Sequence, residues 1–185
     1  MTAEGSENTI LITSLYIETI GCYNQNDKPG MGEDAFVDHL VGTYIVDHVF
    51  FHDETDNEIG AVVHDLSAPE NKLSVFIWDR LLPERRTDVS IRGLLSLVFA
   101  RGYVKRPEDS VMTHTQDHNR VGLKAVVKVE KIYDAYTVFV KTDFSDKLVL
   151  VQFEDRVHPE VGDLIHVEGE LRLEKPEETL DDFLS

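Results

Sequence analysis

One stretch of this chain occurs twice, because residues 64–97 can be laid on residues 142–173 with small gaps. Each copy begins with an Asp-x-Ser turn and ends in an alternating apolar run that a glycine interrupts. The matched pairs include Asp65 and Asp143, Ser67 and Ser145, Asp79 and Asp155, Pro83 and Pro159, and Gly93 and Gly169. Since the match keeps both the turn residues and the alternation, it predicts two copies of one structural unit.

Runs of β-type residues precede each matched block, so each half reads as strand, strand, turn, strand, connector and strand. Closely spaced strands with turn signals predict an all-β fold, here two small antiparallel barrels in tandem with short helices. Gly93 and Gly169 would let a strand bend at a barrel corner. The predicted segments are an extension over 1–41 with a strand at 9–20 and a helix at 32–42, a first domain over 42–107, a linker over 108–119, a second domain over 120–174 and an acidic tail over 175–185.

The turn at Asp65-x-Ser67, followed by a strand that ends at Trp78, resembles the oligonucleotide-binding (OB) fold of the replication protein A and Stn1 type. The second half has Phe153 in place of the tryptophan, and it stops soon after its fourth strand. The resemblance covers most of residues 42–173. It implies two OB-like domains in a non-catalytic subunit that binds single-stranded nucleic acid, DNA rather than RNA, in a replication, repair or telomere complex with other proteins.

Charge is distributed unevenly along the chain. The formal net charge is −17, yet residues 80–131 carry a net of +5 and the remaining residues a net of −22. Phosphate binding draws on lysine and arginine, so the total argues against wrapping a polyanion while the basic middle favours contact with one. The same pattern also fits an ordinary solubilising surface or a protein that recruits basic partners.

Single-strand binders of the OB type combine a basic groove with aromatic stacking platforms. If the aliphatic side chains of the strand at 73–78 fill a barrel, Phe76 and Trp78 point outward, and Arg92 on the next strand is expected beside them. A second patch is expected on the other half. The predicted nucleic-acid-binding residues are Phe76, Trp78, Arg92, Arg101, Lys124, Lys128, Phe139 and Lys141.

Two other functions are compatible with these residues. An acidic OB-fold subunit could contact other proteins and bind little nucleic acid directly. Alternatively, residues 87–106 resemble the recognition helix and wing entry of a winged-helix protein that binds duplex DNA, with Asp88 as N-cap, Gly102 as C-terminal stop, and Arg92 and Arg101 on the helix.

Few features indicate catalysis, a cofactor or a metal. The eight histidines include pairs four residues apart, His48 with His52 and His114 with His118, but such pairs lie about 13 Å apart along a strand. Cys22 is the single cysteine, so an intramolecular disulfide is impossible and a cysteine-based zinc site is excluded. No phosphate loop or nucleophile elbow occurs. We therefore expect a non-enzyme without cofactor or bound metal.

The two ends of the chain suggest location and partners. The N-terminal residues lack the pattern of a secretory signal, and no apolar run is long enough to span a bilayer. We therefore expect an intracellular protein without membrane contact, nuclear if eukaryotic and otherwise cytoplasmic. The acidic tail ends in apolar residues, and Phe183 and Leu184 are candidates for docking a partner protein.

Overall fold

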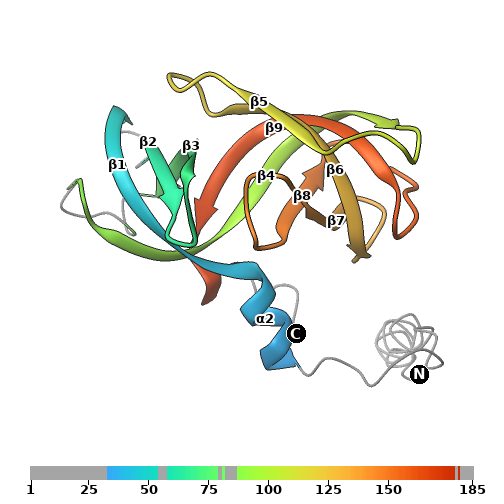
Figure 1. Cartoon of the computed structure of the whole chain (residues 1–185), viewed down its shortest axis with the longest axis horizontal. Coiled ribbons are helices and arrows are strands. Elements are labelled where there is room, and N and C mark those ends of the chain that lie inside the picture. The colour runs from blue at the N-terminus through green and yellow to red at the C-terminus, as the bar shows by residue number, and fades with distance from the viewer. Residues whose placement is uncertain (1–32, 54–57, 79–80, 82–86, 178, 180–185) are drawn as a thin grey trace, which may run out of the picture. The chain divides into compact units, whose positions relative to one another are not determined.

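The structure is a computed structural model that describes residues 33–53, 58–78, 81, 87–177 and 179. It is an all-β protein, which confirms the predicted all-β class, and α2 is a helix of eight residues (Figure 1). The elements are α2 (Glu33–Leu40), β1 (Val41–Asp53), β2 (Glu58–Asp65), β3 (Ala68–Trp78), β4 (Ser90–Lys105), β5 (Thr113–Gln116), β6 (Gly122–Ile132), β7 (Thr137–Lys141), β8 (Val149–Phe153) and β9 (Leu164–Glu174).

The strands pair into two closed rings that share their two long strands. In the first ring the order is β1-β2-β3-β9-β4, and β4 pairs back onto β1. In the second ring the order is β4-β8-β7-β6-β9, and β9 pairs with both β6 and β4. Each ring has one parallel pair, β3 with β9 or β8 with β4, while the other pairs are antiparallel. In Figure 1, β4 and β9 run through both rings.

The pairing of β4 with β9 follows the sequence repeat. Leu95 pairs with Leu173, and Leu97 pairs with Leu171. Since the repeat matches Leu95 to Leu171 and Leu97 to Leu173, exchanging the two halves converts one pair into the other. A local two-fold axis therefore passes through the pair that Ser96 forms with Arg172.

Each ring consequently takes its fifth strand from the other repeat. The first ring contains β1, β2, β3 and the start of β4, and the end of β9 completes it. The second ring contains β6, β7, β8 and the start of β9, and the end of β4 completes it. The second ring therefore closes without a fifth strand from its own repeat.

The glycines that interrupt β4 and β9 lie where the two long strands approach each other closely. A Cβ atom added to Gly93 would lie 2.8 Å from Cδ1 of Leu173, and one added to Gly169 would lie 2.8 Å from the carbonyl oxygen of Val98. These distances are shorter than van der Waals contact, so neither position has room for a side chain, and glycine is required at both. The glycines thus serve the contact between β4 and β9.

One hydrophobic core runs through both rings. Buried residues from β1, β2, β3, β6, β7 and β8 belong to the same cluster, joined by the shared strands. The described residues from Glu33 onward accordingly form one compact unit. The boundaries at 42–107, 108–119 and 120–174 remain predictions, and the segment expected as a linker contains β5.

The predicted recognition helix over 87–106 is wrong, because residues 90–105 form the strand β4. Leu94 and Val98 are buried as well as Leu95 and Leu97, so both faces of the middle of β4 are covered. A strand buried on both faces carries a near-continuous apolar run, and such a run imitates helical spacing. Asp88 and Gly102, which were expected to cap and to stop that helix, both have left-handed backbone angles, with φ of 58° and 70°.

The short helix predicted at 32–42 is present as α2, although the chain enters β1 at Val41, one residue before the expected stop. The strand predicted at 9–20 lies outside the described residues. Among the described helical residues, none forms a helix of the length and hydropathy needed to cross a membrane.

Candidate binding faces

A continuous row of paired residues crosses both rings on their outer side and is arranged symmetrically about the local two-fold axis. We call it the shared row. In order from β1 to β6 it consists of Phe51, Gly60, Phe76, Arg172, Ser96, Leu150, Phe139 and Lys131. The axis lies between Arg172 and Ser96, so the first three residues correspond to the last three in reverse order. The two halves of the row differ in what covers them.

The half of the row on the first ring is open. Phe51 is 45% exposed, Phe76 is half-buried, and their ring centroids lie 6.4 Å apart. Gly60 lies between them in the row and is itself buried, since a Cβ there would come within 2.8 Å of Cε2 of Phe50 and within 2.9 Å of Cβ of Phe51. Trp78 is 44% exposed and follows Phe76 on the same side of β3, where it pairs with Glu58. We call Phe51, Phe76 and Trp78 the aromatic face.

Arg172 lies at the inner end of the aromatic face, paired in register with Phe76. Its Nη2 is 2.6 Å from Oε1 of Glu170 and 3.4 Å from Oε1 of Glu58. The guanidinium carbon also lies 5.5 Å from the centre of the Phe99 ring. Two carboxylates therefore lie beside one cation that is only 17% exposed, so the positive charge of Arg172 is compensated.

The half of the row on the second ring is covered by α2. Phe139 is 1% exposed and its ring meets that of Phe36 edge-on, with centroids 5.1 Å apart. Nζ of Lys131 lies 3.8 Å from the centre of the same Phe36 ring, and burial holds the pKa of Lys131 below its usual value. The backbone N–H of Leu148 donates to the carbonyl oxygen of His39 over 2.8 Å, which ties the end of α2 to the second ring.

Phe139 was expected as an exposed stacking platform, and this prediction is wrong. The residue does point away from the barrel interior, as the alternation of β7 requires. However, α2 packs on that side, and Leu40, Val41, Leu94 and Leu150 bury Phe139 together. The alternation of a strand shows which way a side chain points but does not show what covers it.

Arg92 was expected beside the aromatic pair, and this prediction is also wrong. The strand β4 pairs with β1 and β9, not with β3, so Arg92 lies next to Thr43 and contacts Glu177 at 3.8 Å. Arg172 occupies the place beside Phe76 instead. The predicted neighbours that do come together are Phe76 with Trp78, and Lys128 with Lys141, which pair across β6 and β7.

Carboxylates accompany most of the predicted basic residues. Nζ of Lys124 lies 3.1 Å from Oε1 of Glu168, and Nζ of Lys128 lies 3.7 Å from Oε1 of Glu130. Lys141 is exposed and has no such partner among the described residues. The second predicted patch thus carries few uncompensated positive charges.

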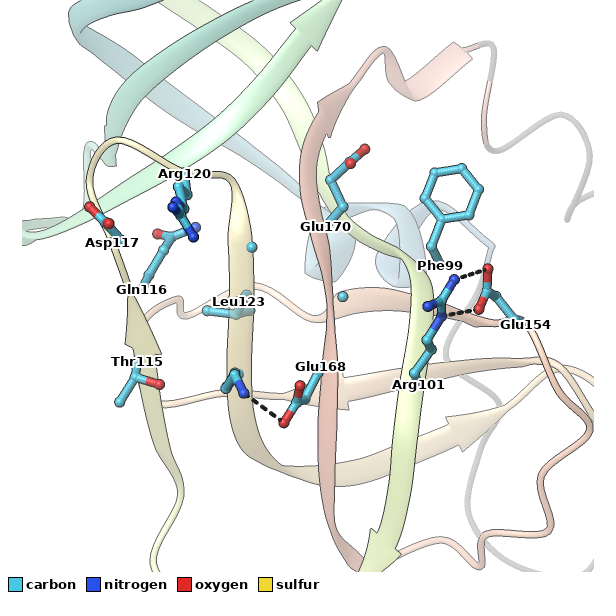
Figure 2. A pocket seen from close by; sticks show the side chains of 13 residues that line it. Phe99, Arg101, Thr115, Gln116, Asp117, Arg120, Leu123, Glu154, Glu168 and Glu170 are labelled. Carbon is cyan, nitrogen blue, oxygen red and sulfur yellow. Dashed lines mark hydrogen bonds and ion pairs between the residues drawn. The ribbon is translucent and has the colours of Figure 1, made fainter.

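Arg101 lines a groove of about 890 Å³ on the outer side of β4, β9 and β6 (Figure 2). Its guanidinium binds Glu154 through two hydrogen bonds, and this contact holds the pKa of the Glu154 carboxyl below its usual value. In register, Glu168 lies between Arg101 and Lys124. Four carboxylates and three basic groups line the groove, which therefore carries no positive excess.

Sequence reasoning missed Phe51 and Arg172. Phe51 lies in the apolar run of β1, where strand alternation could have placed it outward. Arg172 comes from the strand that the second repeat contributes to the first ring, and nothing in the sequence match signals that exchange. Phe183 and Leu184, predicted to dock a partner, lie outside the described residues.

Among the described residues, no group of three histidine, cysteine or acidic side chains is arranged to hold a metal ion. His114 contacts Asp143 at 2.9 Å and packs edge-on against Phe144. The described surface thus offers a partly exposed aromatic face, an equivalent face covered by α2, and a groove of mixed charge. No family model, curated protein or solved structure matches this chain.

Proposed function

We propose that each ring is an OB-type barrel and that the chain is a non-catalytic subunit that binds a partner protein through the aromatic face. Support for the fold comes from the five strands of each closed ring and from the repeat that relates the rings. The aromatic face lies on β2 and β3 with Phe51 of β1 beside them, and the second and third strands form the ligand face of OB domains. Work in a replication, repair or telomere complex is a prediction from the resemblance alone.

The observation that carries the choice of a protein partner is the pairing of Arg172, beside the aromatic face, with two carboxylates. Binding of single strands needs cations that replace the counterions of the phosphates. Here the arginine of the face is paired with both Glu58 and Glu170. Interfaces between proteins, in contrast, are enriched in aromatic residues and arginine at their centre. The net charge of −17 would further steer a basic partner toward the chain.

Affinity capture with matched variants tests this proposal. A protein retained by the wild type should also be retained by Tyr136→Ala. This control variant removes an exposed aromatic side chain that lies on the second ring of strands. The same protein should be lost with Phe76→Ala combined with Trp78→Ala, because these changes remove the aromatic contacts. Equal retention of every captured protein by the double variant would contradict the proposal.

Single-stranded DNA is the second candidate ligand, because Phe76 and Trp78 lie on the strands that OB domains use for oligonucleotides. Anisotropy of a labelled oligothymidine, measured over a range of salt concentrations, separates the two ligands. With a protein partner as the true ligand, the oligonucleotide shows no saturable binding even at low salt. Binding that falls steeply with log salt and weakens in Phe76→Ala would favour DNA instead.

A further inference from the structure

We propose that the aromatic face receives an amphipathic helix from a basic partner protein, in the way that the second ring receives α2. This inference rests on the proposed function, since it names the kind of partner that the aromatic face binds. In the second ring, the helix α2 already covers the residues that correspond to the aromatic face.

The local two-fold axis sets the correspondence between the two halves of the shared row. Phe76 pairs with Arg172 on one side of the axis, and Leu150 pairs with Ser96 on the other. One strand further out, Gly60 therefore corresponds to Phe139, and the next strand places Phe51 opposite Lys131. On the second ring these positions lie under α2, whereas on the first ring the Phe50 ring lies over Gly60, and Phe51 remains 45% exposed.

The helix α2 shows how such a position is covered. Phe36, Val37 and Leu40 pack against the cluster that contains Phe139 and Leu150, so the contact uses positions i, i+1 and i+4 of one helix face. The end of the helix is fixed by hydrogen bonds from the second ring to its carbonyl oxygens. Leu148 N–H donates to His39, and Nζ of Lys147 donates to the carbonyl of Asp38 over 2.6 Å.

No described segment takes the place of α2 on the first ring. The segment that precedes β6, as α2 precedes β1, forms β5 instead. Its Gln116 side chain accepts from Ser74 N–H at 2.8 Å and also donates to the Ser74 carbonyl oxygen. This contact ties β5 to β3 at the position that corresponds to Leu148, yet Phe51 and Trp78 stay almost half exposed. Exposed aromatic residues gathered on one face mark an interaction site.

The side chains of the aromatic face indicate which residue types the partner helix should carry. Three aromatic side chains favour aliphatic and aromatic residues on the helix, by the helix-in-groove mode of recognition. The chain carries a net charge of −17, so lysine or arginine residues beside the apolar stripe of the helix would complement its surface. A helix with the spacing of α2 but with basic flanks fits both features.

Trp78 is the single tryptophan of the chain, so its fluorescence reports on this face directly. The probe is a synthetic peptide of about 16 residues, long enough to hold a helix, with Phe, Val and Leu at the spacing of α2 and lysine on the other faces. A second peptide is identical except for a proline at its centre, which breaks the helix. We expect saturable binding of the helical peptide and binding at least about tenfold weaker for the proline peptide.

Variants locate the binding. Phe76→Ala should weaken binding of the helical peptide by about tenfold, whereas Tyr136→Ala should leave the dissociation constant unchanged. Equal binding of both peptides, no binding of either, or equal binding by Phe76→Ala would overturn the inference. A Trp78 signal that changes with protein concentration alone would assign the face to a second copy of the chain and overturn it as well. Partner capture that still depends on Phe76 would leave the proposed function standing in each case.

Discussion

The two rings have the same strand pattern and differ in what lies on their outer face. On the second ring α2 covers Phe139 and Leu150, and the apolar contact is completed within the chain. On the first ring the corresponding residues include Gly60 and Phe76, and the aromatic side chains around them are half exposed. A repeated fold thus uses one copy of the face for its own stability, whereas the other copy leaves aromatic side chains exposed.

The shared strands limit how different the two rings can become. Because β4 and β9 each belong to both rings, a change in either strand acts on the whole unit. The outer faces are less constrained, since α2 covers Phe139 and Leu150 of the second ring while the exposed aromatic side chains lie on strands of the first. Changes in the shared strands should therefore affect both rings alike, and changes in the outer faces should affect them differently.

The largest effect is expected from shortening a leucine at the crossing of β4 and β9. Leu97→Ala and Leu171→Ala should each lower the free energy of unfolding by about 2–5 kcal/mol, because both side chains are fully buried. In urea, each variant should unfold in one transition reported equally by Trp78 in the first ring and by far-UV circular dichroism. Two separate transitions in either variant would show that the rings are independent.

The crossing glycines should show a smaller effect of equal size in the two rings. Gly93→Ala and Gly169→Ala each place a methyl group within 2.8 Å of another atom, so we expect losses of about 1–3 kcal/mol. Gly122→Ala is a matched control, because a Cβ at Gly122 meets no atom within 4 Å. Urea midpoints measure all three variants. A control that is as unstable as the crossing variants would refute the close approach.

The outer faces should respond unequally to loss of an aromatic ring. Phe36→Ala removes the contact of α2 with Phe139 and should cost about 1–2 kcal/mol, less than a fully buried phenylalanine. Phe51→Ala on the open face should change the free energy of unfolding by about 0.5 kcal/mol or less, as surface substitutions do. Thermal denaturation compares them. Equal losses would mean that the first ring is covered as well.

The smallest effect is a dependence of stability on acid from the ion pairs of the groove. Hydrogen bonds from Arg101 and Lys124 hold the pKa values of Glu154 and Glu168 below the ordinary value of 4.5. Their stabilisation is therefore fully present above pH 4.5 and is lost as the pH falls through the lowered pKa values. Both carboxylates are exposed to solvent, so we expect a shallow decline that Arg101→Ala reduces further. A decline unchanged in Arg101→Ala would assign it to other groups.

Much of the fold could be predicted from the sequence. The repeat of Asp65 at Asp143 and of Gly93 at Gly169 predicted two similar β units, and the strand alternation placed Phe76 and Trp78 outward. The exchange of strands could not be predicted, since a repeat shows which residues are alike and not which strands pair. For the same reason Arg92 was placed beside Phe76, where the structure has Arg172. The cover over Phe139 comes from α2, whose packing partner is not encoded in its own periodicity.

Cross-strand nuclear Overhauser effects test the two-fold arrangement most directly, because the correspondence between the open and the covered face depends on it. The two-fold arrangement predicts contacts between backbone protons of Leu95 and Leu173 and of Leu97 and Leu171. It also predicts contacts from Phe76 to Arg172 and from Leu150 to Ser96. Rings closed within each repeat, with no contacts from β3 to β9 or from β8 to β4, would contradict it.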